Sequence, residues 1–344
     1  METSASGCCP YDGGVLTEVL PMLLTFEFLL GVLGNGAALW IFCCHIKPWK
    51  SSTVFLFNLA LADFLLLVVL PFRASYYAAE MDWRFGELFC RVFLFMVSLN
   101  RSGSIVFLTV VAVDRYMRVV HPHHQLNSML FSRAVCLAVA LWGIAASLNV
   151  HLLAQPQSLL LAGSNTTQCE SFIICLQSDP ASLWYKSVFV VLFLVPLAVI
   201  VLCSLRIVSE LRKRHLDQHA RIKKALHVVS AVVVVFVICF LPSNLAQLLI
   251  WVKIWTRGRC DAMQDVNKVF YASLALTYLN SVLDPVVYYF SSPTFKKVFS
   301  RLPGEQKVRE GRDGQWTPEA TILNSGIKRS WKVFYSLTKM ADFN

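Results

Sequence analysis

Four charged residues lie inside long apolar stretches of this chain: Asp63, Arg73, Arg101 and Asp284. A charge in the hydrocarbon of a bilayer costs roughly 3 kcal/mol on insertion scales, so each of these residues needs a functional or structural reason. Two carboxylates at similar depth predict a shared cation or proton, and a buried guanidinium group predicts recognition of an anion. These four residues are the first candidates for a functional site.

The two carboxylates have polar neighbours. Pro285 follows Asp284 directly, and because proline has no N–H it frees a backbone carbonyl one turn earlier in the same helix. Polar side chains expected at similar depth would complete an oxygen-rich cage around Asp63 and Asp284: Asn35, Asn100, Ser104, Asn280 and Ser281. A bound cation and a purely structural hydrogen-bond network are both compatible with this set.

Arg101 indicates a ligand more specifically than the two carboxylates do. It lies about four helical turns before Arg115, on the helix face expected to look into the interior. A buried guanidinium without a carboxylate partner is very costly, and Glu27 is only a distant partner. We therefore expect the ligand to bring a carboxylate, which suits the guanidinium fork bidentately. The alternative is a water-filled site with a structurally paired arginine.

Arg73 allows two interpretations. It lies about three turns beyond Asp63, near the expected mouth of a pocket. There it would either be a second contact for an anion or extend its side chain outward to solvent.

Seven apolar stretches must position these side chains. Of the 344 residues, 56% are hydrophobic and 15% are charged, which is more apolar surface than one water-soluble core can hide. A helix needs roughly 20 apolar residues to cross a bilayer. The expected fold is an all-α membrane protein, a seven-transmembrane helix bundle with spans near 19–44, 52–79, 87–119, 132–153, 183–208, 225–252 and 264–291.

Basic residues between the spans predict the orientation. Most fall on one side, which the positive-inside rule assigns to the cytosol, so the amino terminus is expected outside. The expected protein is a multi-pass plasma-membrane protein with an extracellular N-terminus (1–18), the bundle (19–291), a short amphipathic cytoplasmic helix (292–302) and a mostly disordered cytoplasmic tail (303–344). The net charge of +10 thus reflects the basic residues on the cytosolic side of the membrane, and no nucleic-acid partner is expected.

Six cysteines fall on the predicted outer side: Cys8, Cys9, Cys90, Cys169, Cys175 and Cys260. An even set in an oxidising compartment predicts disulfides, whose pairing the composition leaves open. The same side carries Asn165, the first residue of an Asn-Thr-Thr glycosylation acceptor. An enzyme is not expected, because the sequence shows no Ser/His/Asp grouping and no cluster with metal-ligand spacing.

Eight landmarks occur in order along the spans, and together they resemble those of the rhodopsin-like, class A G protein-coupled receptors. They are Gly34-Asn35, Leu59 to Asp63, Cys90, Asp114-Arg115-Tyr116, Trp142, Pro196, Cys239 to Pro242 and Asp284 to Tyr288. An Asp-Arg-Tyr sequence alone would be weak evidence for this resemblance, but the ordered set of landmarks covers all seven spans. The chain departs from the family pattern at Phe240, where the family has Trp, and at Asp284, where it has Asn.

The resemblance implies a mechanism of activation. Asp114 would restrain Arg115 at rest, and Arg115 would engage a heterotrimeric inhibitory G protein once the sixth span swings outward. The other implied activation residues are Tyr116, Phe240, Pro242, Asp284, Pro285 and Tyr288. The resemblance also implies an allosteric sodium site, and no other cofactor, formed by Asp63, Asn100, Ser104, Asn280 and Asp284. Arrestin and membrane lipid are the further implied partners.

Local sequences resemble the hydroxycarboxylic acid receptors and their relatives, the oxoeicosanoid and hydroxyeicosatetraenoic acid receptors. The stretches that carry this resemblance are Asn100 to Thr109, Val119 to His124, Cys169 to Phe172 and Tyr288 to Pro293. It implies that Arg101 anchors a carboxylate ligand, with other pocket positions at Ser171, Phe172, Thr277 and Tyr278. It also implies three disulfides, Cys90–Cys169, Cys8–Cys175 and Cys9–Cys260, which would hold the amino terminus over the pocket.

One departure bears on the ligand. Gln247 stands where the hydroxycarboxylic acid receptors place an Arg, which leaves a less polar pocket. This favours an oxidised long-chain fatty acid, an oxo- or hydroxy-eicosanoid. A short hydroxycarboxylic acid such as lactate or hydroxybutyrate is the alternative. A nucleotide or peptide is a more distant one, since Arg73 and Arg101 are few cations for a triphosphate.

Overall fold

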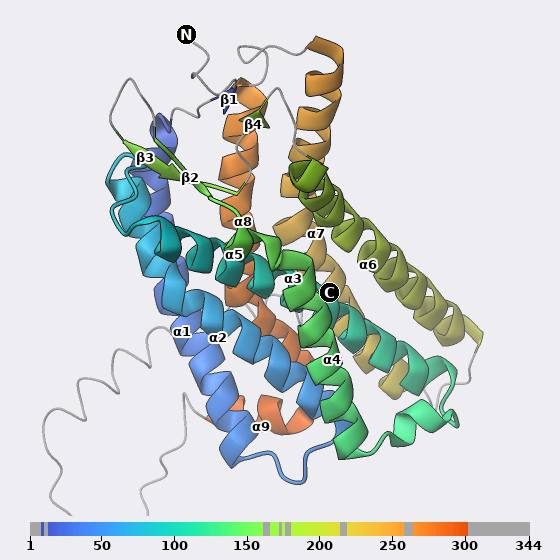
Figure 1. The fold of residues 1–344 in the computed structure, drawn as a ribbon. Helices are drawn as coiled ribbons and strands as arrows, with labels where there is room; N and C mark the ends of the chain where they lie inside the picture. The colour runs from blue at the N-terminus through green and yellow to red at the C-terminus, as the bar shows by residue number, and fades with distance from the viewer. Residues whose placement is uncertain are drawn as a thin grey trace, which may run out of the picture.

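The computed structural model describes residues 8–9, 13–160, 166–171, 174–175, 180–213, 219–257 and 264–301. Within these residues the long helices form one bundle (Figure 1), made of α1 (Val15–Cys44), α2 (Ser51–Ala78), α3 (Glu87–Val120), α4 (Phe131–Asn149), α6 (Pro180–Lys213), α7 (His219–Arg257) and α8 (Gln264–Ser291). The predicted all-α bundle of seven helices is confirmed.

The two ends of the bundle carry different short elements (Figure 1). At the end that we call the strand end, β1 (Cys8–Cys9) pairs with β4 (Ile174–Cys175), and β2 (Ser158–Leu160) pairs with β3 (Thr167–Cys169), near the single turn α5 (His151–Ala154). At the opposite end, which we call the α9 end, lie the 3-10 helix η1 (Gln125–Ser128) and α9 (Pro293–Arg301). The strand end and the α9 end therefore offer different binding surfaces.

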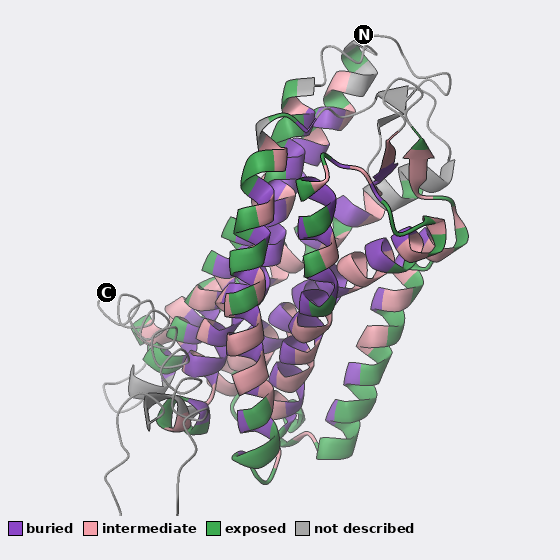
Figure 2. Cartoon of the chain, turned by 90° about the vertical axis from the view of Figure 1, so that its left-hand side faces the viewer, coloured by how far each residue is buried: buried purple, intermediate pink, exposed green. Residues whose placement is uncertain are grey.

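The outer faces of the helices are apolar. Met22 of α1, Leu202 of α6 and Leu249 of α7 are 71%, 60% and 54% exposed. Figure 2 shows exposed residues along these faces and buried residues between the helices. Among the described helices, every long one except α8 is long and apolar enough to cross a bilayer. Polar residues such as Asn280 and Asp284 lower the hydropathy of α8, which nevertheless packs against α1, α2 and α7.

α9 is fixed to the bundle by one aromatic side chain. Phe295 is fully buried, and its ring centroid lies 5.8 Å from that of Phe42 in α1 and 6.0 Å from that of Tyr288 in α8. Lys296 and Lys297, which follow Phe295, are exposed. This one-sided burial confirms the short amphipathic helix predicted for 292–302.

Candidate functional site

A disulfide organises the strand end. Cys90, in the first turn of α3, is bonded to Cys169 at the end of β3 with a sulfur–sulfur distance of 2.00 Å, as predicted. The connection between α2 and α3 pairs with the same strand, because the N–H of Thr167 donates to Asp82 at 3.2 Å. A hydrogen bond from Arg84, together with this one, holds the pKa of Asp82 below its ordinary value. The residues after Cys169 are thereby fixed over the ends of α2 and α3.

Glu170, the next residue, forms a buried ion pair with Arg73 of α2. Nη2 of Arg73 lies 2.9 Å from Oε2 of Glu170, and the two side chains are 2% and 3% exposed. Arg73 also donates to the hydroxyl of Tyr77 at 3.0 Å and to the carbonyl of Cys169 at 3.3 Å, and it interacts electrostatically with Tyr278 of α8. Burial raises the pKa of Glu170, and Arg73 opposes this rise. We call Arg73, Tyr77, Glu170 and Tyr278 the Arg73 cluster.

This cluster decides between the two interpretations of Arg73. The side chain does not extend outward to solvent, because it is buried between α2, α8 and the residue after β3. Its charge is compensated by Glu170, so an anionic ligand would have to compete with a carboxylate of the protein itself. A role of Arg73 as a direct ligand contact stays a prediction.

Arg101 lies inside the bundle, as its position in the sequence predicts. The residue is 8% exposed, and its guanidinium carbon lies 3.4 Å from the ring centroid of Phe189 in α6 and 5.8 Å from that of Phe240 in α7. Stacking engages the face of a guanidinium, whereas its N–H donors lie at the edge, where a carboxylate binds. The geometry is compatible with an anion anchor, and that role stays a prediction.

Other predicted pocket residues are buried on α7 and α8. Gln247 and Thr277 are 1% and 4% exposed. The hydroxyl of Thr277 donates to the carbonyl of Cys239 at 3.2 Å and so joins α8 to α7 close to Phe240. Further polar side chains are buried on these two helices: Asn244, Asn267 and Ser273. The strand-end halves of α7 and α8 therefore bury several polar side chains inside the bundle.

Asp63 of α2 and Asp284 of α8 meet in the centre of the bundle. Both are fully buried, and their carboxyl groups lie close enough to interact directly. The hydroxyls of Ser281, Tyr288 and Ser104 donate to Asp63 at 2.9, 3.0 and 3.3 Å. Two carboxyl groups this close require a shared proton or a cation, because two like charges repel strongly in a low-dielectric interior.

The remaining predicted sodium ligands lie in the same cluster. Asn100 donates to Asp63 at 3.4 Å, and Asn280 donates to Asp284 at 3.0 Å. Oδ1 of Asn280 and Oδ1 of Asp284 are buried and have no hydrogen-bond partner among the described residues. Unsatisfied oxygen acceptors beside a carboxylate pair fit a hard cation such as sodium.

Pro285 has its expected effect on α8. Because proline has no N–H, the carbonyl of Ser281 four residues earlier loses its partner within the helix. That carbonyl accepts instead from Nδ2 of Asn35 at 2.6 Å, and Oδ1 of Asn35 accepts from the hydroxyl of Tyr288 at 3.2 Å. Asn35 therefore ties α1 to α8 beside the two carboxylates.

At the α9 end, Asp114 has closer partners than Arg115. Nη2 of Arg115 lies 3.6 Å from Asp114, whereas Nε of Arg118 donates to both carboxylate oxygens at 3.0 Å and Ser52 donates at 2.8 Å. Nε of Arg115 is buried, without a hydrogen-bond partner in the part of the chain that the structure describes. The predicted pair of Asp114 and Arg115 is present, but Arg118 and Ser52 hold the carboxylate more closely.

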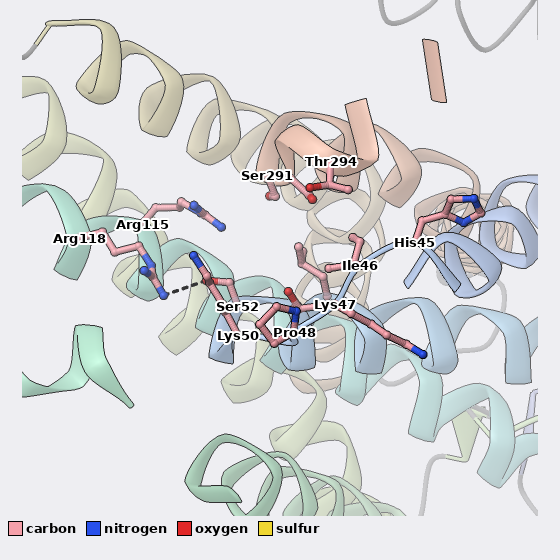
Figure 3. Close-up of a pocket in the computed structure, with 13 residues that line it drawn as sticks. His45, Ile46, Lys47, Pro48, Lys50, Ser52, Arg115, Arg118, Ser291 and Thr294 are labelled. Carbon is pink, nitrogen blue, oxygen red and sulfur yellow. Dashed lines mark hydrogen bonds between the residues drawn. The ribbon is translucent and has the colours of Figure 1, made fainter. Parts of the chain in front are cut away.

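Two cavities open beside Arg115 and Arg118. The first, of about 460 Å³, extends toward the connection between α1 and α2 and the junction of α8 with α9 (Figure 3), and we call it the α9 cavity. The second, of about 480 Å³, extends toward η1 and α7 and reaches Lys224 and Val228. Beside these cavities, the hydroxyl of Tyr116 lies 3.1 Å from Nε2 of His121.

Some partners of these charges were not predicted from the sequence. Glu170 was not predicted as the partner of Arg73. The sequence did contain one indication of this pair. Glu170 follows Cys169, and the disulfide from Cys169 to Cys90 brings Glu170 to the end of the bundle where Arg73 lies. Arg118 lies one turn after Asp114 on the same helix, but the sequence analysis predicted only the adjacent Arg115 as the partner of Asp114.

Several predictions fall on residues that are not described. Phe172, the glycosylation acceptor Asn165, Cys260 and the tail 303–344 lie outside the described residues. Ser171 is described and is half-buried. The backbones of Cys8 and Cys175 are direct partners in the β1–β4 ribbon, a register that suits the predicted disulfide. The disulfides Cys8–Cys175 and Cys9–Cys260 stay predictions.

Comparison with known proteins gives consistent matches over the whole bundle. The sequence profile of the 7 transmembrane receptor (rhodopsin family) matches residues 34–288. Hydroxycarboxylic acid receptor 2 of Homo sapiens is 48% identical, over 95% of this chain and 94% of its own length. Hydroxycarboxylic acid receptor 1 of Homo sapiens is 45% identical, over 97% and 95%. Oxoeicosanoid receptor 1 of Homo sapiens is 38% identical, over 96% and 82%.

Proposed function

The chain belongs to the rhodopsin family of seven-transmembrane receptors, in the group of the hydroxycarboxylic acid and oxoeicosanoid receptors, and on this premise we propose that a carboxylate-bearing ligand activates it. The ligand enters at the strand end, which faces the outside of the cell. The α9 end faces the cytosol, an orientation supported by its cations Lys47, Lys50 and Arg133. The activated receptor lowers cAMP through an inhibitory G protein.

The position of Arg101 carries the proposal. It is a guanidinium between Phe189 of α6 and Phe240 of α7, in the interior of a membrane bundle. The two aromatic rings lie beside the guanidinium, and a carboxylate can bind its edge in two parallel hydrogen bonds. Because Phe240 belongs to the same helix as Pro242, a ligand on Arg101 acts directly on the span that must move during activation.

The Arg73 cluster limits the charge of the ligand. Glu170 neutralises Arg73 at 2.9 Å, so the second guanidinium at the strand end is already balanced by the protein. A second carboxylate on the ligand would compete with Glu170 and would lose its hydration without gaining a new counter-charge. We infer that the ligand carries one carboxylate.

Two kinds of ligand meet this requirement. A short hydroxycarboxylic acid is favoured by the buried polar side chains of α7 and α8, which include Asn244, Gln247 and Thr277, and by the higher identity to the hydroxycarboxylic acid receptors. An oxidised long-chain fatty acid is the second candidate. It is favoured by Gln247, an uncharged side chain that leaves the predicted pocket less polar.

We also propose that the cluster of Asp63 and Asp284 holds a sodium ion. Asn100, Ser104 and Asn280 complete the oxygen donors, and the unsatisfied Oδ1 atoms of Asn280 and Asp284 support this assignment. A cation there would offset the repulsion between the two carboxylates and would link α2, α3 and α8.

The test is inhibition of forskolin-raised cAMP in transfected cells, with short hydroxy acids and oxidised long-chain fatty acids compared at matched concentrations. Pertussis toxin abolishes the response if an inhibitory G protein carries it. A toxin-sensitive response to hydroxy acids alone supports the first candidate, and one to fatty acids alone supports the second. If neither class of ligand inhibits cAMP formation, the proposed ligand chemistry is contradicted.

Two variants of the anchor sharpen this test. Arg101→Ala should abolish the response to every carboxylate agonist while surface expression stays unchanged. Arg101→Lys keeps the charge but not the planar fork, so its response should be weakened rather than absent. A normal response of Arg101→Ala at normal surface expression would show that another group anchors the ligand.

A further inference from the structure

Asn244 of α7 has one polar atom without a partner in the interior of the bundle. The residue is 1% exposed, and its Oδ1 atom is buried and has no hydrogen-bond partner among the residues that the structure describes. A buried acceptor that loses its water without gaining a donor destabilises the protein, so such an atom requires an explanation. A ligand that brings the missing donor would supply one.

The amide of Asn244 is held in one orientation. Its Nδ2 donates to the backbone carbonyl of Phe240, one turn earlier, at 2.6 Å. The same carbonyl also accepts from the hydroxyl of Ser243 at 3.1 Å. Turning the amide over would place Oδ1 against this carbonyl, one acceptor against another. The group that bonds to Oδ1 must therefore be a hydrogen-bond donor.

Asn244 lies one helical turn from the contact between Phe240 and Arg101. The ring centroid of Phe240 is 5.8 Å from the guanidinium carbon of Arg101. Residues four positions apart share one face of a helix, and one turn of this length rises about 6 Å. Asn244 therefore faces the same part of the interior as Phe240, on the strand-end side of the proposed carboxylate anchor.

The other buried polar atoms without partners on the described parts of α7 and α8 lie at different levels of the bundle. Nε1 of Trp251 and Oδ1 of Asn267 lie toward the strand end, and Trp251 is eleven residues, or about 16 Å, beyond Phe240. The rest lie toward the α9 end, on Asn280, Asp284 and Ser291. Within the described parts of these two helices, Asn244 is therefore the residue with an unpaired polar atom closest to the ring beside Arg101.

From these contacts we propose that Asn244 accepts a hydrogen bond from a hydroxyl group on the second or third carbon of the agonist, and so selects hydroxy acids over oxo acids and unsubstituted acids. A carboxylate on the edge of Arg101 leaves its neighbouring carbons within reach of a side chain about one turn away. A hydroxyl donates, whereas an oxo oxygen only accepts and would face Oδ1 as a second acceptor. An unsubstituted chain would cover Oδ1 without any donor. The proposal rests on Arg101 as the carboxylate anchor of the proposed function.

The experiment measures inhibition of forskolin-raised cAMP in transfected cells by three acids of one chain length: 3-hydroxybutanoate, 3-oxobutanoate and butanoate. Lactate, pyruvate and propanoate form a second set, with the substituent on the second carbon. For the unmodified receptor we expect the hydroxy acid of one set to be about 30-fold more potent than the unsubstituted acid, the effect of one buried hydrogen bond. The oxo acid should be at least as weak as the unsubstituted acid.

Asn244→Leu replaces the amide with an apolar side chain of similar size. It should lower the potency of the hydroxy acid about 30-fold and leave that of the unsubstituted acid unchanged, so the ratio of the two potencies should fall to about one. Because the ratio is taken within one variant, a change in surface expression affects both acids alike. Asn244→Ala carries the same prediction if the leucine variant does not reach the cell surface.

Ser243→Ala is the matched control. It removes the other side-chain donor to the carbonyl of Phe240 and leaves Oδ1 of Asn244 in place, so it should keep the preference for the hydroxy acid. A preference that Ser243→Ala removes as completely as Asn244→Leu would assign the effect to the local shape of α7, and would overturn the proposed contact.

Two further outcomes would overturn the role of Asn244 while the carboxylate anchor stands. One is an equal response of the unmodified receptor to all acids of both sets, and the other is a preference for the hydroxy acid that Asn244→Leu and Asn244→Ala both retain. In either case Arg101→Ala still abolishes the response. A response only to acids without a hydroxyl on the second or third carbon would also overturn it. If no carboxylate activates the receptor, the proposed function itself fails.

Discussion

Nη2 of Arg73 and Oε2 of Glu170 lie 2.9 Å apart in a pair that is almost completely buried. The two residues are 97 positions apart in the chain. Cys169, directly before Glu170, is bonded to Cys90, so one short segment is attached to α2 by an ion pair and to α3 by a disulfide. The strand end is therefore held closed by two different kinds of bond.

Removal of one member of this pair should destabilise the receptor strongly. Arg73→Met or Glu170→Met alone leaves a buried charge without its partner, which costs about 3–5 kcal/mol. The double variant buries no charge and should be more stable than either single variant. Thermal unfolding of the purified receptor, followed by tryptophan fluorescence, measures all four forms.

The exposed pair in the neighbouring connection is the control. Arg84 lies 2.9 Å from Asp82, but its side chain is 73% exposed. Arg84→Met should change the free energy of unfolding by about 1 kcal/mol or less. If the losses of Arg73→Met and Glu170→Met simply add in the double variant, the pair is not coupled as the structure indicates.

Asn35 should matter because of Pro285. In Asn35→Ala the carbonyl of Ser281 is buried without a donor, which costs about 1–3 kcal/mol. In Pro285→Ala the backbone N–H of residue 285 returns and can bond that carbonyl within the helix. Asn35→Ala should therefore cost less when Pro285→Ala is also present. Unfolding midpoints of the four forms check this, and strictly additive losses would contradict the shared carbonyl.

Sodium should stabilise the receptor through Asp63 and Asp284. At ten times its Kd a bound ion adds about 1.4 kcal/mol, a shift of a few degrees in the unfolding midpoint. Unfolding should be measured in sodium chloride and in choline chloride at equal ionic strength. The difference should vanish in Asp284→Asn. An equal midpoint of the unmodified receptor in the two salts would show that a proton, rather than sodium, separates the carboxylates.

Arg118 should control basal activity. In Arg118→Gln, Asp114 loses its closest cation and turns to Arg115, which is thereby restrained more firmly. Because a charge-assisted hydrogen bond contributes about 1.5–3 kcal/mol, basal nucleotide exchange should fall by about tenfold. Exchange on an inhibitory G protein in vesicles measures this, with Arg133→Gln as the control for lost charge. Unchanged or higher basal exchange in Arg118→Gln would mean that Asp114 does not hold Arg115.

Features that depend on local sequence were predictable. Apolar runs longer than the bilayer requires predicted the seven helices, and the burial of Phe295 in α9 follows from helical spacing. The missing N–H of Pro285 predicted a carbonyl without a helical partner. Each of these depends on residues within one or two turns of each other, because hydropathy and helix periodicity are local properties.

The partners of the buried charges were decided by the tertiary structure. Helix periodicity shows which face Arg73 occupies, but not that Glu170 of a distant segment would meet it, nor that Ser52 would approach Asp114 across 62 positions. Likewise Asn35 and Ser281 meet across 246 positions. The helices, their order and the charges that they bury could be predicted from the amino-acid sequence. The packing of the helices determines which charged side chains pair. Such pairing depends on how the helices are rotated and shifted relative to one another, and the sequence of one helix does not specify this.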